Sequence, residues 1–231
     1  HGTMVSSLIA GQGRVSGGVI GVAPGVELLA VSVGLGVGGA DTDAQVAQAI
    51  IWSVENGASV INLSLSRNSE RWPASWDEAF LYAFESDVVI VAASGNREAQ
   101  SYATAPATIP GVLSVTAVDK AGNVNSSAGA GGIGVAVAAP GIDMLGSFPG
   151  GEIETWEGSS AAAPIVTGLV ALMRQADPVA SANDIIQRVI STAVDLGDPG
   201  FDGIYGYGLI DPIAAVDSSA MSDSNPLGSL A

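Results

Sequence analysis

A run of small residues that leads from a glycine into a long apolar helix constrains this chain most. It reads Gly-Ser-Ser-Ala-Ala-Ala-Pro over residues 158–164, and apolar residues continue as far as Met173. Proline lacks a backbone N–H, which is harmless among the first four helical positions because their donors have no acceptor inside the helix. We therefore expect the helix to begin near Ala161. Ser160 would then lie at its amino end, where partial positive charge and free N–H groups stabilise negative charge.

Two interpretations of Ser160 stay open on this stretch alone. The serine could simply cap a buried helix. It could also be a nucleophile, which would need a base and a hydrogen-bond donor for an oxyanion elsewhere in the chain. The sequence holds a single histidine, His1. An imidazole base for Ser160 would therefore have to be His1.

Composition excludes several classes of protein. The 231 residues, 48% hydrophobic and 13% charged, are enough for one α/β domain with a large core. A net charge of −16 would repel phosphate, so we expect no nucleic-acid partner. The absence of cysteine excludes disulfides, thiolate metal sites and a cysteine nucleophile. No apolar run reaches the roughly 18 residues of a membrane span. Because residue 1 is a histidine and no signal peptide is present, we expect a processed or trimmed piece.

Helical and strand-like segments alternate along the chain, which predicts a mostly parallel central sheet with helices on both faces, an α/β fold of three layers. We expect residues 1–218 to form the domain and residues 219–231, rich in serine and glycine, to form a flexible tail or linker. The expected helices cover residues 1–11, 42–55, 76–85, 161–173, 182–193 and 212–216, and the expected strands residues 19–22, 26–33, 59–66, 88–93, 112–118 and 135–139.

Two of the expected strands end in polar residues. Residues 64–66 follow one buried strand, and Asn96 closes the Ser-Gly-Asn that follows another. The carboxyl ends of parallel strands meet at the edge of the sheet where such folds bind ligands. The amide of Asn96 is therefore a candidate donor to an oxyanion, although a Gly-Asn pair also suits a simple turn.

Residues Gly34–Gly39 match the G-x-G-x-x-G dinucleotide fingerprint, and they stand between an expected strand and an expected helix. Asp41 and Asp43 come shortly after this segment in the sequence, and their carboxylates would stand where a pyrophosphate would have to lie. We interpret these carboxylates as a helix cap and a partner of the helix dipole. A dinucleotide-dependent enzyme remains a rival hypothesis, which titration with NAD would decide.

Three acidic residues, Asp195, Asp198 and Asp202, lie in a loop rich in glycine and proline. Hard oxygen ligands suit calcium, so a calcium site there is one interpretation, and a merely solvated loop is the other. No other cofactor is expected, and no metal ligand is assigned.

Five separated segments, taken in order, resemble the subtilisin-like serine peptidases, the subtilases. The resemblance covers about residues 1–217 and implies the three-layer subtilisin-like fold and a serine endopeptidase that hydrolyses peptide bonds through an acyl-enzyme. It implies that His1 is the base, Asn96 the oxyanion donor and Ser160, rather than Ser159, the nucleophile. The segments are His-Gly-Thr-Met-Val at 1–5, Val-Ile-Asn-Leu-Ser-Leu-Ser at 60–66, Ala-Ala-Ser-Gly-Asn at 92–96, Gly-Ser-Ser-Ala-Ala-Ala-Pro at 158–164 and Tyr-Gly-Leu-Ile-Asp at 207–211.

The resemblance also implies where a protein or peptide substrate would bind. The substrate would lie extended between two strands and place the side chain before the cut in a pocket without charge, so we expect an apolar or uncharged residue there. The implied residues are Gly39, Ala40 and Asp41 on one side of the substrate, Ser64, Leu65 and Ser66 on the other, Ala93, Ser94 and Gly95 as a further pocket wall, and Thr104 near the pocket floor.

The largest departure from the family is a missing residue. Subtilases carry the aspartate that orients the histidine on a strand upstream of it, and no acidic residue of this chain matches that motif. We expect the chain alone to be weakly active or inactive, with the aspartate supplied by a separate N-terminal segment or another polypeptide. Two alternatives share the fold: an inactive binding or scaffold module, and a processing peptidase dedicated to one partner. The resemblance implies a secreted or cell-envelope location of bacterial type.

Overall fold

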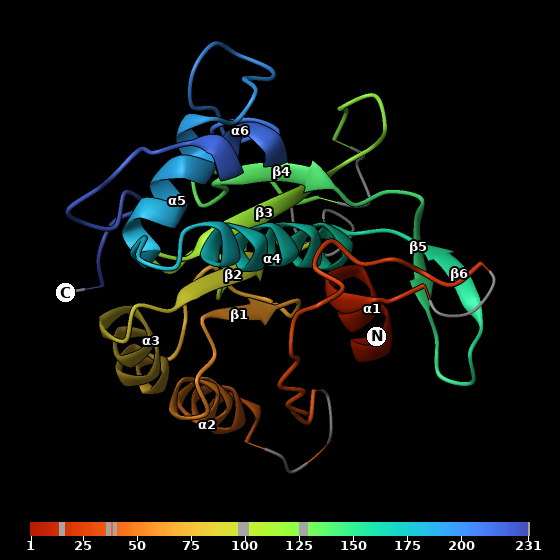
Figure 1. Cartoon of the computed structure of the whole chain (residues 1–231). Helices are drawn as coiled ribbons and strands as arrows, with labels where there is room; N and C mark the ends of the chain where they lie inside the picture. Colours follow the sequence, from red (N-terminus) through yellow and green to blue (C-terminus); the bar gives the residue numbers. More distant parts are fainter. Residues whose placement is uncertain (14–16, 36–37, 39–40, 97–101, 125–128, 231) are drawn as a thin grey trace.

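Four parallel strands form the central sheet of the computed structural model, which describes residues 1–13, 17–35, 38, 41–96, 102–124 and 129–230 (Figure 1). The strands lie side by side in the order of the sequence, and every neighbouring pair is parallel. This confirms the predicted parallel sheet. The strands are β1 (Val60–Leu63), β2 (Val89–Ala93), β3 (Leu113–Val118) and β4 (Val137–Pro140).

Helices cover both faces of this sheet, because alternate residues of each buried strand point to opposite sides. On β2, Val89 and Val91 face the core formed with the helices of residues 159–176, 182–191 and 212–217, whereas Ile90 faces the core formed with the helices of residues 42–55 and 77–85. The three-layer α/β fold is therefore confirmed (Figure 1). One layer holds α4 (Ser159–Ala176), α5 (Ala182–Ser191) and α6 (Pro212–Asp217), and the other holds α2 (Thr42–Glu55) and α3 (Asp77–Glu85), which follows the 3-10 turn Ala74–Trp76.

A helix and a hairpin lie at one end of the sheet. Helix α1 (Gly2–Ala10) packs against α4 and against β5 (Met144–Ser147), and the Ser7 hydroxyl accepts a hydrogen bond of 3.0 Å from the Ser147 N–H. Strands β5 (Met144–Ser147) and β6 (Ile153–Trp156) pair antiparallel. The sequence pattern did not predict this hairpin, because its strands are short and partly exposed and show no clean alternation of apolar residues.

The strands predicted at residues 19–22 and 26–33 are not formed. Ile20 makes one isolated bridge with Gln12, and residues 26–33 run without strand structure. The apolar pattern of 26–33 suits a strand, but a strand also needs a hydrogen-bonded neighbour. In the described part of the chain, no strand lies beside this segment. The prediction was wrong for that reason.

Residues 219–230 lie along the domain. The Arg188 Nε donates to the carbonyl of Ala220 at 3.0 Å, Asp184 Oδ1 accepts from the Ser222 N–H at 2.8 Å, and the Asn225 amide donates to Gly111 O at 3.0 Å. The domain limit at residue 218 and the flexibility of the tail stay predictions. None of the described helices combines the length and apolar character that crossing a bilayer requires.

Candidate active site

Ser160 lies in the first turn of α4, which begins at Ser159, two residues earlier than predicted. Gly158 precedes the helix with φ 132°, a conformation that favours glycine. A Cβ added at Gly158 would also lie 3.1 Å from the Asn96 Nδ2. The glycine therefore lets the chain turn into the helix and lets the asparagine approach. Ser160 itself is half-buried at the positive end of an 18-residue helix.

Pro164 leaves the carbonyl of Ser160 without a hydrogen bond inside the helix. Because α4 begins at Ser159, Pro164 is the sixth helical residue and lies inside the helix, not among the first four positions as predicted. Its absent N–H would otherwise donate to the carbonyl of Ser160, four residues back. That carbonyl instead accepts a hydrogen bond of 3.0 Å from the hydroxyl of Ser64. The proline thus frees an acceptor that ties the first turn of α4 to the end of β1.

Asn96 lies against the same turn of α4. Its Oδ1 accepts hydrogen bonds from the N–H and from the hydroxyl of Ser159, both at 3.1 Å. The Ser159 hydroxyl is also 3.0 Å from Gly95 O and 3.1 Å from Gly95 N. Ser159 thus holds the oxygen of the Asn96 amide. The two hydrogens on Nδ2 are the donors that this amide can offer to a ligand. The structure therefore brings Asn96 beside the residue that precedes Ser160.

His1 contacts Trp156, a residue close to Ser160 in the sequence. Its exposed ring packs edge-on against Trp156, with the ring centroids 5.7 Å apart and the planes at 85°. Trp156 ends β6 and stands four residues before Ser160. Among the described residues, no hydrogen bond joins the imidazole to Ser160; the Ser160 hydroxyl instead lies 3.4 Å from Ser64 O. The role of His1 as base stays a prediction.

Six of the predicted substrate-binding residues lie at the ends of two neighbouring strands. Ser64, Leu65 and Ser66 come directly after β1, whereas Ala93 ends β2 and Ser94 and Gly95 follow it, fully buried. Because β1 and β2 are parallel, both sets lie at the carboxyl edge of the sheet. Gly39 and Ala40 lie outside the described residues.

Thr104 lies behind the Ser94–Gly95 turn. Its N–H donates to Ser94 O at 3.1 Å, and its hydroxyl is 3.2 Å from the position of a Cβ added at Gly95. The side chain is 2% exposed, and the hydroxyl has no hydrogen-bond partner in the described part of the chain. The position of Thr104 as a pocket floor stays a prediction.

Asp41 and Asp43 have structural partners at the start of α2. Asp41 accepts a hydrogen bond from the Ala44 N–H and caps the helix, as predicted. Asp43 forms an ion pair with Arg67. The residues Gly36, Val37 and Gly39 of the dinucleotide fingerprint lie outside the described residues. The described ones include Gly34, whose N–H donates to the side chain of Gln45 at 2.7 Å.

In the loop that contains Asp195, Asp198 and Asp202, two carboxylates accept hydrogen bonds from backbone N–H groups of the same loop. Asp202 accepts from the N–H groups of Asp198, Ile204 and Tyr205, and Asp195 accepts from that of Gly200. Within the described ranges, no group of three or more His, Cys, Asp or Glu side chains could hold a metal ion. Calcium binding in this loop stays a prediction.

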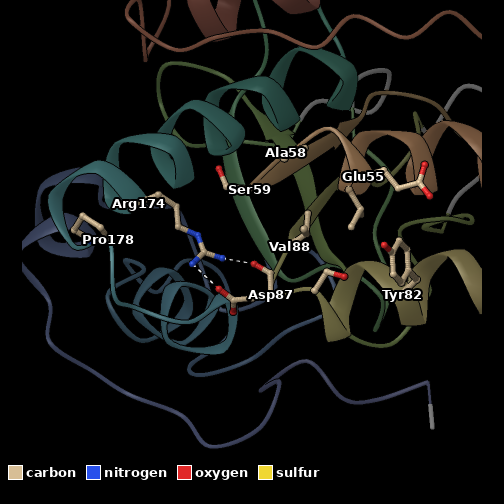
Figure 2. A pocket seen from close by; sticks show the side chains of 11 residues that line it. Glu55, Ala58, Ser59, Tyr82, Asp87, Val88, Arg174 and Pro178 are labelled. Carbon is tan, nitrogen blue, oxygen red and sulfur yellow. Dashed lines mark hydrogen bonds and ion pairs between the residues drawn. The ribbon is translucent and has the colours of Figure 1, made fainter.

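Two clefts border β1. One, of about 700 Å³, lies at the amino ends of β1 and β2 (Figure 2). There the Arg174 guanidinium pairs with the Asp87 carboxylate at 2.9 Å and also donates to the Asp87 carbonyl. None of the predicted catalytic or substrate-binding residues lines this cleft. The second cleft, of about 1060 Å³, reaches from the amino end of β1 to its carboxyl end and is lined there by His1, Ser64 and Leu65.

Comparison with known proteins identifies a family. The model of the subtilase family (Peptidase_S8) matches residues 1–208. Fervidolysin of Fervidobacterium pennivorans is 35% identical over 94% of this chain and 34% of its own length. M-protease of Shouchella clausii and Subtilisin Savinase of Lederbergia lenta are each 37% identical over 93% of this chain, which spans 54% and 77% of their lengths. The chain thus spans about a third of fervidolysin and about half of M-protease.

The solved structures agree with the sequence comparison. The crystal structure of fervidolysin, described as a keratinolytic enzyme related to subtilisin, superposes with a TM-score of 0.82 at 32% identity. The superposition covers 95% of this chain and 36% of that one. The fold described above is therefore the subtilisin-like fold.

Proposed function

The chain belongs to the subtilase family, and on that premise we propose that it carries the nucleophile, the base and the oxyanion asparagine of a serine endopeptidase. One observation carries the proposal: Ser160 lies at the positive end of α4, and Asn96 is held against the same turn by Ser159. An oxyanion beside Ser160 would meet the N–H of that turn and the Nδ2 of Asn96, the kind of donors that stabilise a tetrahedral intermediate.

In the proposed mechanism His1 takes the proton from the Ser160 hydroxyl as that oxygen attacks the peptide carbonyl. The imidazole then gives the proton to the leaving amine, and water hydrolyses the acyl-enzyme by the reverse sequence of transfers. Because no hydrogen bond joins the two side chains among the described residues, the imidazole would have to turn toward Ser160 for this transfer. A carboxylate beside the imidazole would hold the productive tautomer.

We further propose that this carboxylate comes from a segment outside these 231 residues, so that the chain alone is weakly active or inactive. Substrates would be proteins or peptides bound in extended form beside Ser64–Ser66, with an uncharged residue before the cut. Arg67 compensates the charge of Asp43 at this edge, so the exposed Asp41 is the acid that would disfavour acidic substrates. A secreted or cell-envelope location follows from the family resemblance.

Labelling with a fluorophosphonate tests the nucleophile without requiring turnover of a peptide. We expect a slow adduct of one label per chain, located on Ser160 by peptide mapping and absent from Ser160→Ala. Ser191→Ala, a change to an exposed serine at the end of α5, is the matched control and should label like the original chain. Labelling at another residue, or no labelling of Ser160 even in a longer form of the protein that includes the segment with the carboxylate, would instead indicate an inactive binding module of the same fold.

A further inference from the structure

Residues 219–230, which we call the strap, follow α6 and contain no helix or strand. The match to the subtilase family ends at residue 208, so the strap lies beyond it. A terminal segment that is rich in serine and lacks secondary structure is an easy target for peptidases unless it is tied down. In this protein both halves of the strap are hydrogen-bonded to the domain.

Two charged side chains of α5 hold the first half of the strap. The Arg188 Nε donates to the carbonyl of Ala220 at 3.0 Å, and Asp184 Oδ1 accepts from the Ser222 N–H at 2.8 Å. Both charged residues are buried, with 6% of Arg188 and 7% of Asp184 exposed. Hydrogen bonds to charged groups are stronger than those between neutral groups. The backbone on either side of Met221 is therefore tied firmly to α5.

The second half of the strap is held at Gly111, two residues before β3. The Asn225 Nδ2 donates to Gly111 O at 3.0 Å, and its Oδ1 accepts from the Leu227 N–H at 2.9 Å. Leu227 O in turn accepts from the Gly111 N–H at 3.1 Å. Leu227 packs against the core on the α4 side of the sheet, and Leu230 packs against the core on the α2 side. The strap thus contacts both cores of the domain.

Met221 differs from the anchored residues around it, because its side chain is 78% exposed. The four residues Ser218–Met221 carry no charge, in a chain whose net charge is −16. This composition suits the substrate site proposed above, which takes an uncharged residue before the cut and disfavours acids near Asp41. The bond between Met221 and Ser222 therefore has the side chains of a substrate.

Docking of the strap protects this bond. A peptidase of the proposed kind binds its substrate in extended form, through hydrogen bonds to the N–H and C=O groups of the substrate backbone. In the docked strap the carbonyl of Ala220 and the N–H of Ser222 already bind side chains of α5. The bond after Met221 can enter an active site only after this part of the strap has left α5.

We infer that the peptide bond between Met221 and Ser222 is a latent processing site, which a second molecule of the active parent peptidase hydrolyses when the strap undocks. The carbon–nitrogen bond breaks, and water supplies the hydroxyl of the new carboxyl group at Met221 and the hydrogen of the new amine at Ser222. This inference rests on the proposed function, because it assigns a substrate to that same site.

The position of the strap explains why the cut requires a second molecule. Its second half lies at the amino end of β3, whereas Ser160 contacts Ser64 at the carboxyl edge of the sheet. Figure 1 shows the two ends of the chain on opposite sides of the molecule, and His1 is one of these ends. A chain therefore cannot present its own strap to its own Ser160 without unfolding.

Limited proteolysis of the full chain tests the site without relying on the activity of the chain. Proteinase K, a serine peptidase of broad specificity, is added at a low ratio, and the cut after Met221 is followed by intact mass. We expect this cut to be slow in the original chain. Asn225→Ala removes two hydrogen bonds of the strap and should make the cut about tenfold faster, because cleavage follows the population of the opened state.

Ser224→Ala is the matched control, because Ser224 is exposed in the same strap and accepts from Ser222 through its carbonyl, which alanine keeps. Its strap should be cut within twofold of the original rate. Amide hydrogen exchange at Gly111 and Ser222 should become faster in Asn225→Ala only. Circular dichroism checks that Asn225→Ala folds, and Leu227→Ala repeats the test at a second anchor.

Equal rates for Asn225→Ala and Ser224→Ala would overturn the inference, and so would rapid cutting after Met221 in the original chain. In a second arm, a longer form of the protein that includes the segment with the carboxylate replaces proteinase K. Fluorophosphonate labelling of Ser160 in that form, with the bond after Met221 left intact in Asn225→Ala, would refute the processing site alone. Cutting by proteinase K as expected, with no labelling of Ser160 in either form, would refute the proposed function alone.

Discussion

Replacing Thr167 with valine should destabilise the chain although the shape of the side chain is kept. The Thr167 hydroxyl lies 2.9 Å from Asn62 Oδ1 and 3.0 Å from Ala163 O. The Asn62 amide donates to the Ser64 hydroxyl at 3.0 Å, and that hydroxyl donates to Ser160 O at 3.0 Å. A chain of hydrogen bonds thus connects the middle of α4 to the turn that holds the candidate nucleophile.

The magnitude follows from burial. Thr167 is 3% exposed, so its valine replacement leaves Asn62 Oδ1 without this partner inside the protein. A buried acceptor that loses its donor costs about 1–3 kcal/mol. Asn62 is only half-buried and water can reach part of it, so we expect a loss near the lower end, about 1 kcal/mol. For a domain of this size, that lowers the Tm by about 2–4 °C.

Urea unfolding followed by tryptophan fluorescence measures the free energy of unfolding of Thr167→Val, Asn62→Ala and the double variant. We expect a coupling energy of at least about 0.5 kcal/mol between the two positions. Thr192→Val is the matched control, because the Thr192 hydroxyl donates only to a carbonyl of its own helix, Arg188 O at 2.7 Å. Strict additivity, or a Thr167→Val chain as stable as Thr192→Val, would refute this account of the hydrogen-bond chain.

Three further substitutions have definite expected outcomes. The pKa of Asp184 lies below its usual range, because burial, which raises it, is outweighed by hydrogen bonds led by the N–H of Ser222. The ionised carboxylate therefore stabilises the fold above the unfolded pKa of about 3.9 and loses this contribution as the pH falls through the lower folded value. Asp184→Asn should be less stable at pH 7, and in urea melts the difference from the original chain should shrink as the pH falls below the unfolded pKa of about 3.9; a constant difference would contradict this. Gly168→Ala should lower the Tm despite a helix-propensity gain of about 1 kcal/mol, because the new Cβ would lie 2.6 Å from Val22 Cβ; a higher Tm by circular dichroism would show that the contact relaxes freely. Asn96→Ala should slow fluorophosphonate labelling about 10²–10³-fold, a magnitude known from the oxyanion asparagine of subtilisin, and an unchanged rate would remove Asn96 from the proposed oxyanion site.

Much of the architecture could be predicted from residue patterns, because burial repeats with the period of the element. The helix over 42–55 has the predicted bounds, and the predicted strands at 88–93 and 112–118 differ from the observed ones by one residue. These segments are bounded by aspartate, serine, glycine or asparagine, so both the type and the limits of the element are local properties. The placement of Ser160 at the amino end of a helix was predictable for the same reason, although the helix begins two residues earlier than predicted.

The candidate site was predictable only in part. The motifs indicated Ser160 and Asn96, but no pattern indicated that Ser159 is the residue that holds the Asn96 amide. Nor did any pattern indicate Asn62 and Thr167, since a polar side chain in a strand or a helix has many candidate partners until the fold selects one. His1 was indicated by elimination, whereas its contact with Trp156 depends on a hairpin that the sequence did not predict.

The sequence by itself determined the α-helices and the four strands of the central sheet, and it placed a serine at the amino end of the longest helix, because these features depend on local composition and period. Only the tertiary structure decided which group donates a hydrogen bond to the Ser160 carbonyl that Pro164 leaves free. That donor is the hydroxyl of Ser64. It also decided that residues 26–33, strand-like in composition, stay unpaired, because a strand exists only where a neighbour offers its hydrogen bonds.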